Sequence, residues 1–321
     1  MSILSLSAYM KSLNKLTGVL ALVGLFLSAC QKDFVIEEEP DPVDPPASTG
    51  TFLHKIYIVD SIAGLTDTAE IFTYFYDAQK RVTLITDSVI EGSSWVLFKS
   101  RKYQYNGTDS LPSRSVSFDY EAAIADNNPL LVDSVVSFHQ YDGAGRNSYD
   151  SSVSLYVTSD IPPYEYLSIT NVRTYQYSGN NIYSAATSSG TGVPTTTYVR
   201  DTALTDGNGN VIQSKRYEVE GGVSTLFLTA AFTYDNKVNP FSKISSFRTL
   251  NVLPFGETFI DEIQAKNNRL KATEVFGSNH FDEDLTGKYT YNSNNLPVKI
   301  ADEYLNAPGE FYKELFVYRS L

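Results

Sequence analysis

The side chain best suited to covalent chemistry is Cys30, the only cysteine in the chain. A single cysteine excludes an intramolecular disulfide, so its thiol is free for another kind of bond. Cys30 follows an apolar run, residues 16–27, which is preceded by Lys11 and Lys15. The run is too short to cross a bilayer, for which a helix needs about 20 apolar residues. A basic start, a short apolar centre and small residues before a cleavage point are typical of a secretory signal peptide.

The four residues that end at the cysteine, Leu27-Ser28-Ala29-Cys30, resemble the bacterial lipobox. The resemblance implies that residues 1–29 are a lipoprotein signal peptide, cut before Cys30, and that the thiol carries a diacylglycerol. Two or three acyl chains, such as palmitate, anchor a protein firmly, because each buried CH₂ contributes roughly 0.8 kcal/mol. We therefore predict a mature chain that is attached to a membrane through Cys30.

Residues 30–50 are predicted to be a linker, because prolines alternate with acidic residues between Glu37 and Pro46. About twenty residues in polyproline II conformation reach on the order of 60 Å. The residue after the cysteine is Gln31. An Asp at this position would resemble the inner-membrane retention signal of enteric bacteria, so its absence favours the outer membrane. Lys32-Asp33 and the acids after them resemble the export tag of Bacteroidetes surface lipoproteins. We therefore expect an outer-membrane location, with the protein displayed at the cell surface.

The charge of the chain bears on its partners. The formal net charge is −12, and the signal region removes two lysines and no acid. A chain this acidic is repelled by phosphate backbones, so we exclude nucleic acid as a partner. Apolar residues make up 42% of the chain and charged residues 19%, which permits a packed core.

No other residues form a catalytic or metal-binding signature. The three histidines, His54, His139 and His280, are too scattered for metal-ligand spacing. The stretch Asp206-Gly-Asn-Gly-Asn210 superficially suggests a calcium loop, but an EF-hand requires Glu where this chain has Tyr217. A tight turn, in which Asn-Gly supplies positive φ, is the better interpretation. We expect no metal and no cofactor.

Six Asp-Ser/Thr-apolar stretches resemble the O-glycosylation site of Bacteroidetes periplasmic proteins. The candidate hydroxyls are Ser61, Thr68, Ser88, Ser110, Ser134 and Thr202. The alternative is structural, because Asp at the start of a strand followed by alternating Ser and Val gives the same pattern. The sequence leaves both interpretations open.

The rest of the chain is organised by a repeated pair of aromatic residues. Each pair has one residue between its members, so both side chains leave the same face of a strand. A turn rich in Asp, Asn and Gly follows each pair. The pairs, one with histidine at its first position, are Tyr74/Tyr76, Tyr103/Tyr105, His139/Tyr141, Tyr175/Tyr177, Phe232/Tyr234 and Tyr289/Tyr291.

Counting two degenerate copies, about eight units of about thirty residues follow, and such units must share a sheet or stack. Residues 51–321 are therefore predicted to be one all-β domain, an antiparallel β-hairpin meander of about sixteen strands. The meander is expected to form a curved sheet or a partly closed roll. Phe232 to Ile244 is the clearest hairpin, with residues 241–247 as its returning strand. Phe316 to Tyr318 is expected to form the terminal strand.

The aromatic-x-Tyr-Asp/Asn unit with its turn resembles the YD (Rhs-type) repeat, most clearly at Tyr141-Asp142-Gly-Ala-Gly145-Arg146. It is most similar to the versions in uncharacterised Bacteroidetes lipoproteins, which implies a location and a fold but no mechanism. The aromatic pairs could stack on sugars, but packing across neighbouring strands is favoured, at about 0.2 to 1 kcal/mol a pair.

Two functional hypotheses remain. The leading one is a non-enzymatic, lipid-anchored envelope protein, a binding or structural module for a glycan, a peptide or a neighbouring envelope protein. The alternative is a polysaccharide-acting hydrolase with a carboxylate pair inside the roll, since two acids across a cleft leave no sequence signature.

Overall fold

The computed structural model describes residues 52–62, 65–91, 93–126, 128, 130–157, 165–190, 193–244, 265–277, 283–304 and 311–321. All of them belong to one compact unit, residues 44–321. The predicted signal peptide, Cys30 and the linker to residue 50 lie outside the described residues. The domain boundaries at 29/30 and 50/51 therefore stay predictions.

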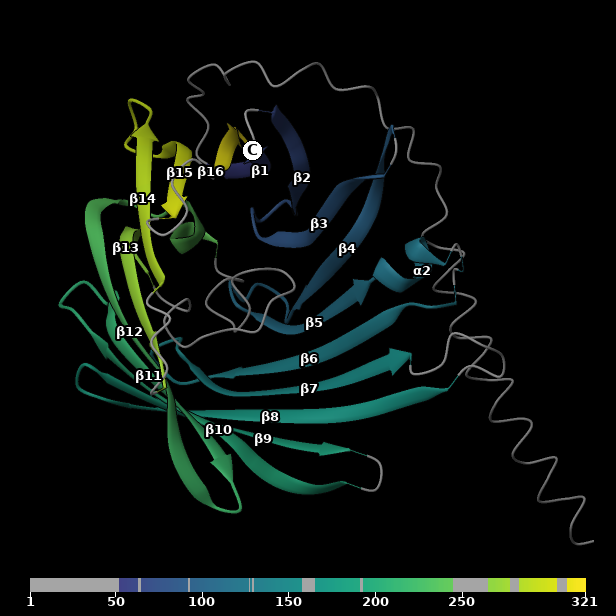
Figure 1. The fold of residues 1–321 in the computed structure, drawn as a ribbon, viewed down its shortest axis with the longest axis vertical. Coiled ribbons are helices and arrows are strands. Elements are labelled where there is room, and N and C mark those ends of the chain that lie inside the picture. The colour runs from purple at the N-terminus through teal and green to yellow at the C-terminus, as the bar shows by residue number, and fades with distance from the viewer. Residues whose placement is uncertain are drawn as a thin grey trace, which may run out of the picture. The chain divides into compact units, whose positions relative to one another are not determined.

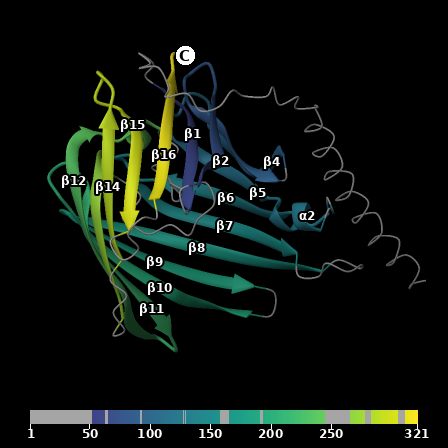
Figure 2. The ribbon, with the colours of Figure 1, turned by 45° about the horizontal axis from the view of Figure 1, so that its top comes forward.

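The described residues form sixteen antiparallel strands, in which each strand pairs with the next along the chain (Figures 1 and 2). The last strand, β16, also pairs with β1, so the sheet closes into a barrel. The predicted all-β meander of about sixteen strands is confirmed, with closure complete rather than partial. Its strands are β1 (Phe52–Ile62), β2 (Leu65–Tyr76), β3 (Val82–Glu91), β4 (Ser94–Tyr105), β5 (Pro112–Asp119), β6 (Asp133–Tyr141), β7 (Asn147–Val157), β8 (Tyr166–Ser178), β9 (Asn181–Gly190), β10 (Val193–Thr205), β11 (Val211–Glu220), β12 (Val223–Val238), β13 (Asn267–Phe276), β14 (Glu283–Tyr291), β15 (Pro297–Tyr304) and β16 (Phe311–Arg319).

Helix is limited, within the described ranges, to α2 (Glu121–Ala125) and the short 3₁₀ helix η1 (Pro240–Lys243). Neither is long and apolar enough to span a bilayer. The returning strand predicted after Tyr234 is wrong where the structure describes it, because η1 occupies this position. Asn239 caps η1 by accepting a bond from the Phe241 N–H, and Pro240 cannot donate to a strand ladder. β12 pairs instead with β13.

The two members of the aromatic pairs that pack in the apolar clusters share a face, as predicted, and this is the inner face of the barrel. Tyr74 is 1% exposed and belongs to an apolar cluster on β1–β4, β15 and β16, against which Tyr76 packs. Phe232 belongs to a second cluster on β8–β13, against which Tyr234 packs. These contacts support packing over sugar stacking as the role of the pairs.

The turns after the pairs explain the Asp, Asn and Gly of the repeat. In the turn from β10 to β11, the Asp206 carboxylate accepts bonds from the backbone N–H groups of Asn208, at 2.8 Å, and Asn210, at 2.9 Å. Gly209 has a φ of +87°, which glycine adopts without strain. The turn interpretation of Asp206 to Asn210 is therefore confirmed.

Candidate functional site

Part of the inner wall differs in character from the two apolar clusters. On β4 to β11, many of the inward positions that are buried carry polar or charged side chains. On the same strands, outward positions include exposed apolar residues such as Phe138 and Val153. The alternation therefore makes this part of the wall polar inside, as in barrels with a wet interior. The buried inward polar residues on these strands include Arg101, Ser115, Ser117, Ser137, His139, Asp150, Ser154, Ser184, Asp201, Ser214 and Arg216.

A serine, a histidine and an aspartate are joined in series across three neighbouring strands. Ser115 Oγ on β5 lies 3.2 Å from His139 Nε2 on β6, and His139 Nδ1 lies 2.6 Å from Asp150 Oδ1 on β7. His139 and Asp150 are direct partners in the β6–β7 register. An ionised carboxylate can only accept, so Nδ1 carries the proton, and in the neutral ring Nε2 accepts from the Ser115 hydroxyl. This is the order of groups that activates a serine nucleophile.

A second polar group, on β8 to β11, centres on one carboxylate. Asp201 Oδ1 accepts a 2.9 Å bond from Arg216 Nε, and Asp201 Oδ2 accepts a 2.9 Å bond from Arg173 Nη1. Ser184 Oγ also donates to Oδ2, at 3.1 Å. One acid therefore holds two guanidinium groups, which leaves this part of the wall locally positive.

A carboxyl pair lies on β2 and β3, but it does not suit glycoside hydrolysis. Burial and a hydrogen bond with Glu70 raise the pKa of Asp87 to about 9, so Asp87 is protonated near neutral pH. Hydrolysing pairs are separated by about 5 to 9.5 Å, so that a sugar or a water fits between them. The direct bond between Glu70 and Asp87 leaves no such space, so this pair gives the hydrolase alternative no support.

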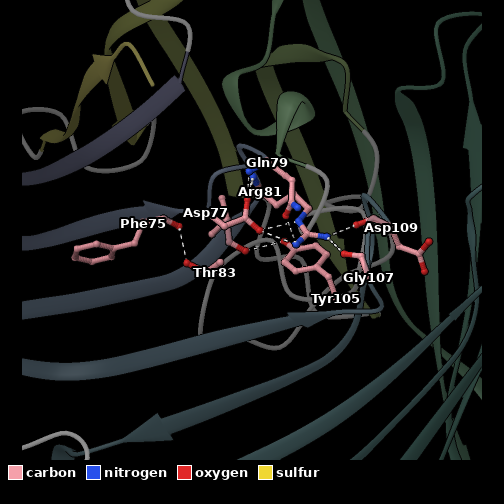
Figure 3. Close-up of polar contacts among 9 residues, drawn as sticks. Phe75, Asp77, Gln79, Arg81, Thr83, Tyr105, Gly107 and Asp109 are labelled. Atoms are coloured by element: carbon pink, nitrogen blue, oxygen red, sulfur yellow. Dashed lines mark hydrogen bonds and ion pairs between the residues drawn. The ribbon is translucent and has the colours of Figure 1, made fainter.

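The rim that carries the repeat turns is cross-linked from one hairpin to the next (Figure 3). Arg81 Nη1 donates to the carbonyl oxygens of Gly107 and Asp109 in the following turn, both at 2.8 Å. Its guanidinium lies 4.3 Å from the ring centroid of Tyr105. Within its own turn, Arg81 Nε donates to Asp77 at 2.8 Å. Burial raises the pKa of Asp77, but the bonds from Arg81 outweigh it and hold that pKa below its usual range.

The structure places several of the predicted glycosylation residues on the outer face. Ser88, Ser134 and Thr202 each follow an aspartate that points inward. For Thr202 this aspartate is Asp201, which binds the two arginines. Asp133 Oδ1 accepts a 2.8 Å bond from the Val157 N–H. These contacts give the aspartates a structural role, and they do not test whether the hydroxyls are glycosylated.

The remaining candidates are dispersed. Ser110 is exposed in the turn after β4, Thr68 is half-buried on β2, and Ser61 lies on β1. Among the side chains that the structure describes, the other five candidates are not brought together into one site.

Sequence reasoning considered His139 as a metal ligand and as a member of a repeat pair, and did not single out Ser115 or Asp150. One signal could have found them. Where the other pairs begin with Tyr or Phe, this pair begins with His139. A polar residue at an inward position where the other pairs have an aromatic residue indicates a role other than packing.

No family model matches the chain, and no curated protein matches it. Among solved structures, a porin-like protein from Bacteroides vulgatus is 12% identical, with a TM-score of 0.48, covering 84% of this chain and 99% of its own. A porin-like protein from Bacteroides uniformis is 14% identical, with a TM-score of 0.45, covering 86% of this chain and 100% of its own. A protein of unknown function from Bacteroides fragilis is 11% identical, with a TM-score of 0.21, covering 50% and 91%.

Proposed function

We propose that this chain is a lipid-anchored protein of the cell envelope whose barrel encloses a polar chamber for a polar ligand, such as a glycan or a peptide. The observation that carries the proposal is the inner wall of β4 to β11, where buried positions hold arginine, aspartate, histidine and serine. A buried polar wall costs stability unless its groups are paired, so its presence favours a role beyond folding.

The anchor rests on Cys30 and on the linker that follows it. An acylated Cys30 at the outer membrane, with the barrel held away from the lipid by residues 30–50, agrees with the resemblance to YD-repeat lipoproteins. Display at the cell surface is part of the same proposal. The tyrosine-led turns that cross-link one rim are the observation that supports this resemblance.

The outer wall favours a barrel outside the bilayer over one that spans it. Ala301 on β15 pairs with Lys288 on one side and Lys313 on the other, on the face opposite the buried Ile300. A lysine facing lipid costs about 2–4 kcal/mol at the bilayer midplane. Two lysines at one level of the wall are therefore more compatible with an aqueous surface.

The anchor is tested in cells with an alkyne analogue of palmitate. We expect the wild-type chain to be labelled and Cys30→Ser to be unlabelled, with the wild-type protein cleaved by protease added to intact cells. Labelling that survives Cys30→Ser would disprove the anchor. Full protection from protease would place the mature chain in the periplasm.

The chamber is tested by calorimetry of the full chain in detergent with neutral and uronate-containing oligosaccharides and with short peptides. We expect saturable binding of at least one probe, weakened at least tenfold by Arg173→Ala and unchanged by Lys288→Ala on the outer wall. Equal effects of the two substitutions, or no binding of any probe at millimolar concentration, would contradict the proposal.

A further inference from the structure

We propose that Ser115, His139 and Asp150 form a nucleophilic centre that hydrolyses carboxylic esters inside the barrel. The three side chains lie in series at hydrogen-bond distance, 3.2 Å and 2.6 Å. All three residues are buried, at 5%, 8% and 7% exposure. The proposal assigns an activity to the chamber and does not depend on the lipid anchor.

The repeat shows that this constellation is a departure from the packing pattern. At the equivalent inward positions, Tyr74 pairs with Ile85 and Tyr289 with Ile300, while Tyr103 and Tyr175 each pair with a serine. In the third copy the same position and its partner are His139 and Asp150. This pair differs from the other four in having two ionisable side chains, and the second ring nitrogen of its histidine contacts the Ser115 hydroxyl.

The chemistry follows from the hydrogen-bond directions. Asp150 accepts the Nδ1 proton and fixes the tautomer in which Nε2 is free to act as a base. Nε2 takes the Ser115 proton as Oγ bonds to the ester carbonyl carbon. The tetrahedral intermediate then collapses, the bond from this carbon to the alcohol oxygen breaks, and His139 returns the proton to the alcohol. Water, deprotonated by His139, attacks the acyl-serine and releases the carboxylic acid, restoring Ser115.

The developing oxyanion needs a donor, and the strand amides are engaged in the sheet ladder. Arg101 on β4 lies on the same inner face, opposite Ser117, and its Nε donates to Ser117 Oγ at 2.6 Å. Arg101 also interacts with Tyr103, the direct partner of Ser115 on β4. Ser117 is the next inward position after Ser115 on β5, so an ester at Ser115 would lie one inward position from a buried guanidinium. A fixed cation there stabilises an oxyanion more strongly than it stabilises a neutral carbonyl.

The surroundings indicate the class of ester. Ser115 has the small Ser137 as its direct partner on β6 and the buried Tyr103 as its direct partner on β4. An aromatic ring on one side restricts the acyl group to a short one, while the charged wall favours a polar alcohol. We therefore assign short-chain acyl esters of polar alcohols as the substrate class.

The test uses the full chain in detergent with a fluorophosphonate probe and with p-nitrophenyl acetate. We expect the probe to modify Ser115, identified by peptide mass spectrometry, and Ser115→Ala to abolish both labelling and hydrolysis. Ser151→Ala removes a hydroxyl on the outer face of β7, where Ser151 pairs with the exposed Phe138, and should leave both unchanged. Asp150→Asn should reduce hydrolysis on the order of 10²–10⁴-fold, because it favours the wrong tautomer.

Circular dichroism and the thermal midpoint show which variants retain the fold. A folded wild-type chain that is neither labelled nor hydrolytic would overturn the proposal, leaving the three residues as a structural hydrogen-bond chain. Labelling at another residue, or a Ser115→Ala variant that is as active as Ser151→Ala, would overturn it equally.

Discussion

The hydroxyl of Tyr105, at the end of β4, donates a 2.7 Å hydrogen bond to the carbonyl of Val82, the first residue of β3. The same kind of bond recurs along the rim. In each case a tyrosine near the end of one strand donates to a carbonyl near the start of the strand before it. Its other examples are Tyr76 to Leu53, Tyr141 to Pro112, Tyr234 to Val211 and Tyr318 to Pro297. In these five hairpins the tyrosine hydroxyl holds the end of the second strand against the start of the first, which accounts for Tyr over Phe at this position, whereas the Tyr291 hydroxyl donates to Asp235.

Removing one of these hydroxyls should destabilise the barrel measurably. Tyr105→Phe leaves the ring in place and the Val82 carbonyl without its partner, which should lower the free energy of unfolding by about 1 kcal/mol. Tyr183→Phe is the control, because Tyr183 is 44% exposed on the outer face. Urea denaturation measures both variants. Equal effects would show that the rim bond contributes nothing specific.

The turn aspartates should make the barrel sensitive to acid. Hydrogen bonds from Arg81 and Arg146 hold the pKa values of Asp77 and Asp142 below their usual range, against burial in the case of Asp77. A depressed folded-state pKa contributes stability that is present above the unfolded value of about 3.9 and is lost as the pH falls through the folded value. The variant with Asn at both positions should show a flatter decline in unfolding free energy between about pH 4 and pH 2. A decline as steep as that of the wild type would contradict this assignment.

Asp87 should have the opposite dependence. Burial and the bond with Glu70 raise its pKa to about 9, so between about pH 4 and pH 9 the folded chain binds a proton that the unfolded chain has lost. Stability linked to this group therefore falls as the pH rises through that window. Asp87→Asn should flatten the dependence and be more stable than the wild type at pH 8. Asp109→Asn, in an exposed turn, is the control, and an unchanged slope in Asp87→Asn would refute the prediction.

The Asp201 carboxylate should be among the most sensitive positions of the wall. Asp201→Asn removes the carboxylate that the buried Arg216 and the half-buried Arg173 share, which should cost about 3 kcal/mol of unfolding free energy. Chemical denaturation of the variant measures the loss. A loss no larger than that of Asp109→Asn would show that water already screens the two arginines.

Glycosylation at the outward hydroxyls remains a separate prediction. Peptides of the protein purified from its native host should carry added hexose at Ser88, Ser134 or Thr202. Unmodified peptides at Ser88 and Ser134 would end this interpretation and leave the inward contacts of the aspartates as the reason for the pattern.

Much of the fold could be predicted because its information is local. Two aromatic residues with one residue between them, such as Tyr74 and Tyr76, indicate a strand and place both side chains on one of its faces. The turn residues after each pair indicate where the strand ends. Closure could not be predicted, because it depends on β1 pairing with β16 at the far end of the chain. The error after Tyr234 arose where Asn239 and Pro240 favour a helix start over a strand.

The polar site was beyond sequence reasoning for a physical reason. Ser115 and Asp150 lie 24 and 11 residues from His139, on different strands, and only the register brings the three together. A shift of one residue in any of these strands would turn a member of the group to the outer face. The one local sign of this site in the sequence was His139, at a position where the other pairs have Tyr or Phe.

The central claim, a wet polar chamber behind a closed wall, is tested most directly by thiol labelling at two adjacent positions. Ser137 is 8% exposed on the inner face, and Phe138 is 48% exposed on the outer face. Single substitutions Ser137→Cys and Phe138→Cys are made in the full acylated chain, with the wild type as the control for Cys30. A small charged methanethiosulfonate should modify both new thiols, whereas a polyethylene-glycol maleimide should modify only the one at position 138. Rapid modification of the thiol at 137 by the large reagent, or no modification of it by the small one, would contradict the account.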